Sequence, residues 1–234
     1  MTIPDDFKKY LNVKCDFIDK CYITRDSQVL KDLLLKIDQT TDEINKHKTL
    51  ELESGNESNA NLLLAIDYFF GTIYYEASMW IKMKESDPNN AWNDLISAQE
   101  CIDCSLYSMN IPEFEQRKYS RKLEAIEALI FPPQHFLSPW FVVESISCSI
   151  CNRDYSDPNC QHIEFRPYRG ELCFRKFTIK NIIHLAKVSH PADKRRRVVS
   201  ISQDKENWRD LMTLGTVKEI IGNNKDTNSE VKSN

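Results

Sequence analysis

The chain has 234 residues, of which 41% are hydrophobic and 28% charged, and its formal net charge is −4 at pH 7. These values are ordinary for a globular protein with a core of its own, in one large domain or two small ones. No run approaches the roughly 18 apolar residues of a membrane span, which excludes a transmembrane protein. The first seven residues lack the basic start and apolar stretch of a signal peptide, so we expect a cytoplasmic location.

The first half of the chain is predicted to be a bundle of four or five helices, spanning residues 1–133. Apolar residues at helical spacing predict helices, interrupted by polar segments, over 29–44, 60–84, 91–109 and 111–130. The second of these helices is apolar nearly all round, which is typical of a central helix. Phe131-Pro132-Pro133 ends the last helix, because proline lacks the backbone donor and restricts the residue before it.

Beyond the prolines the composition changes, and residues 139–202 are rich in Cys, His, Arg, aromatic and β-branched residues. Short strands are expected at Phe141–Val143, Phe177–Ile183 and Val198–Ile201. The fold class predicted is therefore mostly α, with an N-terminal helical bundle followed by a small α+β zinc-binding domain. We further expect a C-terminal helical segment over 203–221 and a disordered tail over 222–234.

Four residues near the middle of the second part have the spacing of a zinc site. Cys148 and Cys151 are separated by two residues, and Cys160 and His162 follow as Cys-x-His. Zinc takes four nitrogen or sulfur ligands in a tetrahedron, so this set closes the shell and predicts a structural Zn²⁺. If His162 is not the fourth ligand, Cys173 is the best substitute.

The chain has eight cysteines, and without a signal peptide they are better explained as thiols or metal ligands than as disulfides. A second Cys-x2-Cys pair, Cys101 and Cys104, lies inside a predicted helix. These two thiols either pack as small apolar groups against a neighbouring helix or bind a second metal with Cys15 and Cys21. The sequence leaves both possibilities open.

Charge is distributed unevenly along the chain. Residues 148–200 contain 11 Lys and Arg against 5 Asp and Glu, a net charge of +6, which leaves −10 for the rest. This basic part is the expected place of any contact with nucleic acid or with a partner, through Arg166, Arg169, Lys194, Arg195, Arg196 and Arg197. The run from Lys194 to Arg197 is alternatively a solvated strand end or a salt-bridged contact with the acidic helical body.

The segment from Cys148 to about Ile201 resembles a segment of poorly characterised bacterial and phage-related proteins. The resemblance rests on C-S-I-C-N-R-D-Y, C-Q-H-I, Y-R-G-E-L-C and the later V-S-H-P-A-D. The last motif also looks like a strand of phage prohead proteases, but the chain lacks a serine and histidine pair at the spacing of such an enzyme. The resemblance implies a bacterial origin and a context in phage defence or mobile elements.

No nucleophile elbow, phosphate-binding loop or dinucleotide-binding motif is present. The sequence therefore favours a non-enzymatic, zinc-stabilised binding or adaptor subunit of a bacterial multiprotein assembly, with other protein subunits as partners and no membrane contact. The alternatives are a nucleic-acid-binding zinc protein and a metal-assisted hydrolase or nuclease. An open metal position beside an acid or base would favour the hydrolase.

Overall fold

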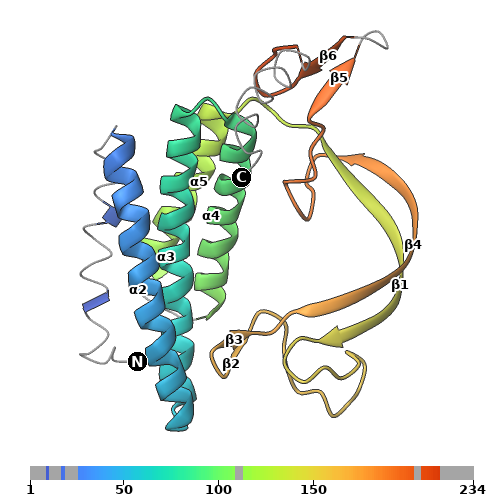
Figure 1. The fold of residues 1–234 in the computed structure, drawn as a ribbon. Helices are drawn as coiled ribbons and strands as arrows, with labels where there is room; N and C mark the ends of the chain where they lie inside the picture. Colours follow the sequence, from blue (N-terminus) through green and yellow to red (C-terminus); the bar gives the residue numbers. More distant parts are fainter. Residues whose placement is uncertain (1–8, 11–16, 19–25, 109–112, 203–206, 217–234) are drawn as a thin grey trace, which may run out of the picture.

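The structure is a computed structural model that describes residues 9–10, 17–18, 26–108, 113–202 and 207–216. Helices come first and strands second, in the order α2 (Ser27–Glu53), α3 (Glu57–Lys84), α4 (Pro88–Ser108), α5 (Glu113–Ile130), β1 (Phe136–Cys148), β2 (Pro167–Tyr168), β3 (Glu171–Leu172), β4 (Arg175–Val188), β5 (Ser200–Ser202) and β6 (Trp208–Asp210). Figure 1 shows the helices side by side and the strands to one side of them.

The four predicted helices are present, and short polar links separate the first three. Asp26 caps α2 by accepting a hydrogen bond from the Gln28 backbone, and Asn56 caps α3 in the same way from Asn59. Pro88 begins α4, where its missing N–H is not needed. The helix α5 ends immediately before Phe131, as the two following prolines predict.

Helix α3 is the centre of the bundle, since α2 and α4 both pack along it. Its side chains are buried on nearly every side, as the sequence predicts for 60–84. The core continues into the strands, because Trp92 of α4 packs edge-on against Phe131 and close to Phe136 at the start of β1. The bundle and the first strand thus share one core.

An ion pair between α3 and α5 lies inside the bundle. The carboxylate of Glu76 in α3 is 1% exposed and lies 2.6 Å from Lys122 Nζ in α5. Tyr119 and Trp80 also donate hydrogen bonds to this carboxylate. The burial of the charge is therefore compensated by three donors, which join α5 to the centre of the bundle.

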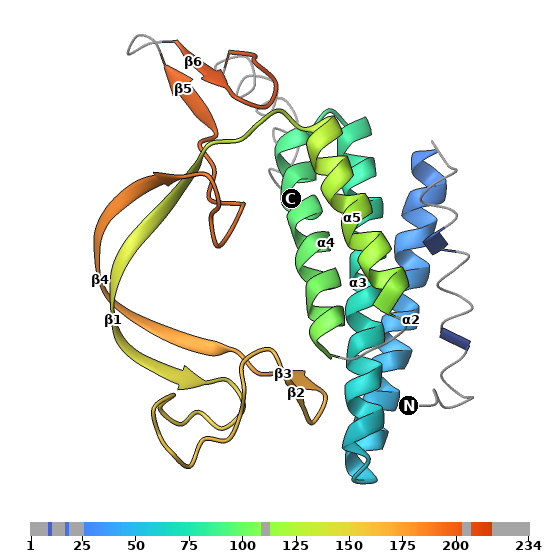
Figure 2. The same cartoon turned by 180° about the vertical axis from the view of Figure 1, so that it is seen from behind.

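The strands β1 and β4 form a long two-stranded antiparallel ribbon, from the pair Phe136 and Val188 to the pair Cys148 and Arg175. Three register shifts interrupt the ladder in the region of Trp140 to Ser145. The views in Figures 1 and 2 agree that the middle of the ribbon bows away from the helices, while both of its ends return to them. We call these 27 residues, Phe136–Cys148 and Arg175–Val188, the ribbon.

Two expectations for the second part need correction. The strands predicted at Phe141–Val143 and Phe177–Ile183 are parts of strands that are at least twice as long. The C-terminal helical segment over 203–221 is wrong for its described residues 207–216, since Trp208–Asp210 is strand β6, paired with β5. Within 131–202 and 207–216 the elements are strands and turns. The predicted disordered tail, 222–234, lies outside the described residues.

Candidate metal centre

The Cys148–Cys151 turn begins where β1 ends. The N–H of Asn152 donates to the Cys148 carbonyl at 2.9 Å, which closes the turn, and Asn152 has a φ of 56°. Asparagine is among the few residues that tolerate this left-handed conformation. The Cys148 N–H donates to the Arg153 carbonyl, also at 2.9 Å, and fixes the chain as it leaves the turn. Cys148 and Cys151 are therefore held side by side by backbone hydrogen bonds.

The polar loop from 152 to 159 brings Cys160 back to this turn. Within it, the carboxylates of Asp154 and Asp157 accept backbone hydrogen bonds two residues ahead, from Ser156 and Asn159. The N–H of Cys160 then donates to the Asp157 carbonyl at 2.9 Å. Such Asx turns order a loop without a core of its own, as the composition of this segment predicts.

The predicted ligands meet in space. The ligand atoms of Cys148, Cys151, Cys160 and His162 all lie within 4.8 Å of one another, a group that can hold a metal ion. The Sγ atoms of Cys151 and Cys160 are 3.7 Å apart, and Cys160 Sγ is 4.0 Å from His162 Nδ1. Three thiols and one imidazole are the donors that zinc prefers in proteins.

A fifth donor lies beside this group, next to Cys148. Cys173, just before β4, is 3% exposed, and its Sγ is 3.7 Å from Cys148 Sγ. Burial raises the pKa of Cys173 to about 11, reinforced by the neighbouring Cys148 thiol. Burial also acts to raise the pKa of Cys148, but hydrogen bonds from the backbone of Cys151 and Ile150 outweigh it and lower this pKa to about 6. The two sulfur atoms therefore lie within hydrogen-bonding distance of each other, and either can be the donor.

The β2–β3 hairpin, next to the cluster, contacts the helical bundle. The backbone N–H groups of Arg169 and Gly170 donate to the side chains of Glu57 and Asn61 at 3.0 and 2.8 Å. Gly170 has a φ of +71°, and a Cβ at this position would lie 3.1 Å from the Lys48 side chain. Only glycine suits both the conformation and the close approach. The metal-centre end of the ribbon is thereby joined to α3.

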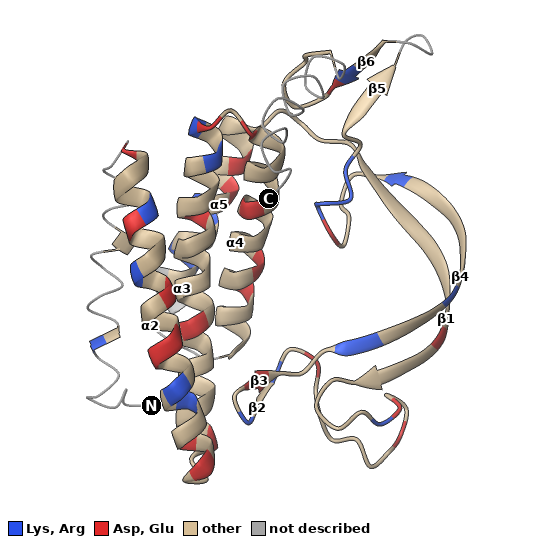
Figure 3. Cartoon of the chain, viewed as in Figure 1, with Lys and Arg blue, Asp and Glu red and all other residues tan. Residues whose placement is uncertain are grey.

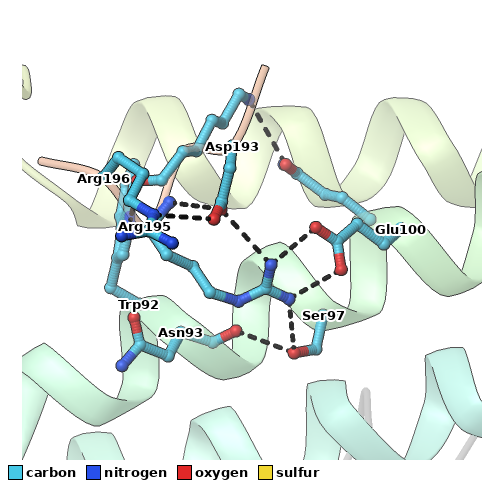
Figure 4. Close-up of polar contacts among 9 residues, drawn as sticks. Trp92, Asn93, Ser97, Glu100, Asp193, Arg195 and Arg196 are labelled. Carbon is cyan, nitrogen blue, oxygen red and sulfur yellow. Dashed lines mark hydrogen bonds and ion pairs between the residues drawn. The ribbon is translucent and has the colours of Figure 1, made fainter. Parts of the chain in front are cut away.

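The predicted basic run joins the other end of the ribbon to the bundle. Arg195 makes a bidentate ion pair with Glu100 of α4, at 2.6 and 2.7 Å, and Lys194 pairs with Glu127 of α5 at 2.6 Å. The Lys194 carbonyl accepts a hydrogen bond from Trp92 at 3.1 Å. Figure 4 shows the Arg195 guanidinium pointing at Glu100 and Ser97, with Arg196 turned aside.

Of the six basic residues expected to contact nucleic acid or a partner, three face inward. Besides Lys194 and Arg195, Arg197 is buried and donates to Asn89 at the start of α4. Figure 3 shows the blue 194–197 segment turned toward helices that bear acidic positions. The remaining three, Arg166, Arg169 and Arg196, are exposed. Of the interpretations given for Lys194–Arg197, a salt-bridged contact with the acidic helical body therefore describes this segment.

We expect Arg195→Ala to loosen the 190–199 segment locally. A partly exposed bidentate pair contributes about 1 kcal/mol, so amide hydrogen exchange of this segment should accelerate about fivefold. Arg196→Ala is the matched control, because its neighbouring guanidinium is exposed and has only a 3.6 Å contact with Asp193. Equal exchange rates in the two variants would contradict the anchoring role of Arg195.

The second cysteine pair lies within the helical bundle. A Cβ built on Gly71 of α3 would lie 3.2 Å from Cys101 Sγ, so this thiol packs against the glycine. Burial, the largest cause, raises the pKa of Cys101 to about 12 and that of Cys104 to about 11. Both findings favour small apolar packing groups. Cys15 and Cys21, the other members of the suggested second metal site, lie outside the described residues.

The exposed apolar surface of the ribbon is a feature that the sequence analysis missed. Eight large apolar side chains of the ribbon each have 40% or more of their surface exposed: Trp140, Phe141, Val142, Phe177, Ile179, Ile182, Ile183 and Leu185. The signal in the sequence is the apolar content of Phe177–Leu185. It predicts a strand, but it does not show whether another element covers the apolar side chains of that strand.

No family model matches the chain, and neither a curated protein nor a solved structure matches it. Among the described helices, none combines the length and apolar character needed to cross a membrane.

Proposed function

We propose that this chain is a binding subunit, in which a zinc-stabilised segment holds the ribbon in place for a partner protein. The observation that carries the proposal is the exposed apolar surface of the ribbon. Several large apolar side chains exposed on one element are typical of interaction sites on proteins. A two-stranded ribbon is also only marginally stable in water by itself, so its ends need the anchors described above.

The charged side chains of the ribbon are mostly basic, which indicates the charge that its partner should have. Lys176, Lys180 and Lys187 stand on β4, whereas Glu144 is the single acidic residue of the ribbon. The ribbon of a second copy would bring like charges together, which opposes pairing of two ribbons. A different protein, with an apolar surface bordered by Asp or Glu, fits the ribbon better.

The backbone of β4 supplies a second means of contact. In the part of the chain that the structure describes, β4 pairs only with β1, and its outer edge has no strand beside it. An extended segment of the partner can add to such an edge through main-chain hydrogen bonds, with side-chain contacts giving the specificity. The partner we infer therefore presents an acidic and apolar strand.

The metal in this proposal is Zn²⁺, with a structural role. Cys148, Cys151 and Cys160 are three of its ligands, and the fourth is His162 or Cys173. Five protein donors for a metal that takes four leave no coordination position for water, which distinguishes the site from a catalytic zinc centre. This supports a binding subunit over the metal-assisted hydrolase or nuclease.

The inward orientation of Lys194, Arg195 and Arg197 weakens the case for nucleic acid as the main ligand. These three cations are neutralised or buried by the bundle and are not available to phosphates. We further propose that the chain belongs to a bacterial multiprotein assembly, with phage defence or mobile elements as the setting to test first. It rests on the resemblance of residues 148–201 to bacterial and phage-related proteins.

The test is affinity purification of the full chain from its native host, with Leu185→Asp as the variant. A charge placed on the docking surface should weaken binding of the identified partner about 30-fold, which corresponds to a loss of about 2 kcal/mol. Leu35→Asp is the matched control, since Leu35 on α2 is 62% exposed and Leu185 is 61% exposed. This control should bind as the parent chain does.

The identity of the bound molecule decides between occupants. A stoichiometric partner protein that protects the amides of β4 from hydrogen exchange, and is lost in Leu185→Asp alone, supports the proposal. The proposal would be overturned if the chain self-associates through the ribbon, or if both variants bind the partner equally. It would also be overturned if the bound molecule is a nucleic acid whose binding is lost in Leu185→Asp.

A further inference from the structure

The metal centre contains one donor too many. Besides Cys148, Cys151, Cys160 and His162, the buried thiol of Cys173 lies 3.7 Å from Cys148 Sγ. A tetrahedral zinc binds four ligands, so one of the five stays outside the shell. Cys148, Cys151 and Cys160 are ligands in either case, and the fourth ligand is His162 or Cys173.

Two distances between sulfur atoms match those expected in a shell of four thiolates. With zinc–sulfur bonds of about 2.3 Å, neighbouring sulfurs of a tetrahedron are about 3.8 Å apart. The Cys148–Cys173 and Cys151–Cys160 pairs are both separated by 3.7 Å. These pairs share no residue, so in a shell of four thiolates they would be two opposite edges of the tetrahedron.

The histidine fits the shell less well. Zinc–nitrogen bonds of about 2.0 Å and zinc–sulfur bonds of about 2.3 Å place the two ligand atoms about 3.5 Å apart. The distance from Cys160 Sγ to His162 Nδ1 is 4.0 Å. The His162 ring instead packs edge-on against Tyr168, with the ring centroids 4.7 Å apart, and the Tyr168 hydroxyl accepts the Ile163 N–H at 2.9 Å. His162 thus has a packing contact that orders the loop after Cys160.

Cys173 is held where a ligand is needed. Its N–H donates to the Arg166 carbonyl at 2.9 Å, and its own carbonyl accepts the Phe165 N–H at 2.8 Å. The neighbouring backbone joins the Cys148 turn, since Ser149 N–H donates to the Phe174 carbonyl and Phe174 N–H donates to Ser149 Oγ. Two independent segments therefore hold the Cys148 and Cys173 thiols together.

We propose that Cys173 is the fourth ligand of the metal, in a shell of four thiolates with Cys148, Cys151 and Cys160, and that His162 lies outside this shell as a positioning residue. This assignment rests on the proposed zinc site. It makes β4 part of the metal centre, because Cys173 stands two residues before Arg175, the first residue of that strand. The metal then bridges the end of β1 and the start of β4.

X-ray absorption spectroscopy of the zinc-loaded full chain tests the assignment directly. We expect four sulfur scatterers at about 2.3 Å and no nitrogen scatterer at about 2.0 Å. His162→Ala should keep one zinc with the same four-sulfur shell, and any loss of affinity should stay within the roughly 10–100-fold range of outer-shell partners. Cys173→Ala should lose one sulfur from the shell and weaken zinc binding more than His162→Ala does.

The outcomes separate this assignment from the site itself. Three sulfurs and one nitrogen in the parent chain would overturn the role of Cys173 and leave a zinc site with His162. A parent chain that binds no zinc would overturn the whole centre. If Cys173→Ala does not fold, the spectra of the parent chain and of His162→Ala still decide, since neither needs that variant.

Discussion

Removing the first cysteine pair should abolish metal binding. We expect the purified chain to contain about one zinc, and Cys148→Ala/Cys151→Ala to contain none, because the remaining donors cannot complete the shell. Metal binding in small zinc-dependent segments contributes on the order of 10 kcal/mol, so residues 148–173 should lose their local structure. Elemental analysis gives the zinc content, and limited trypsin digestion should show new early cleavage at Arg153 and Arg169.

The chain offers a matched control for this experiment. Cys101→Ala/Cys104→Ala removes two thiols at the same spacing from α4. This variant should retain one zinc and show no new cleavage within 148–173. Full zinc occupancy in Cys148→Ala/Cys151→Ala would contradict the metal centre, and loss of zinc in the control would reopen the second site.

The buried ion pair of the bundle should account for the largest effect on global stability. Lys122→Met keeps most of the aliphatic stem and removes the charge that faces Glu76. Breaking a buried pair by removing one partner typically costs 3–5 kcal/mol, and we expect about 3 kcal/mol because Tyr119 and Trp80 still donate to the carboxylate. Urea unfolding followed by far-ultraviolet circular dichroism measures this loss.

Two further variants isolate the cause. Lys118→Met makes the same change at an exposed position of α5 and should alter stability by less than about 0.5 kcal/mol. Glu76→Gln/Lys122→Met removes both charges and should recover part of the lost stability, since no uncompensated charge stays buried. A loss below about 1 kcal/mol in Lys122→Met would show that the pair contributes little.

The helices could be predicted from the sequence because their determinants are local. The apolar spacing lies within each helix, and the polar links at 54–56 and 85–87 and the prolines after Phe131 lie directly at the helix ends. The meeting of Cys148, Cys151, Cys160 and His162 could be predicted for the same reason, since one turn and one short loop bring them together. Cys173 was named only as a substitute, because its approach depends on the distant β1–β4 pairing.

The strands depended on pairing between segments that are far apart in the chain. Lys180 and Asn181 interrupt the apolar pattern of β4, yet the strand continues through them because β1 lies alongside. The helical expectation for 203–221 failed at Trp208–Asp210 because β5 pairs with these residues. The basic run had two open interpretations, and only the positions of Glu100 and Glu127 on the packed helices favour one of them.

The three register shifts in the ribbon have a consequence for the chain at high concentration. A flat ribbon with apolar side chains and a free edge is a template on which identical ribbons stack into cross-β fibres. Each shift places an unpaired residue in one strand and bends the ladder, so the spacing of the edge no longer matches a straight copy of itself. Substitutions or deletions that straighten the region from Trp140 to Ser145 would thus turn a surface open to docking into a nucleus for amyloid.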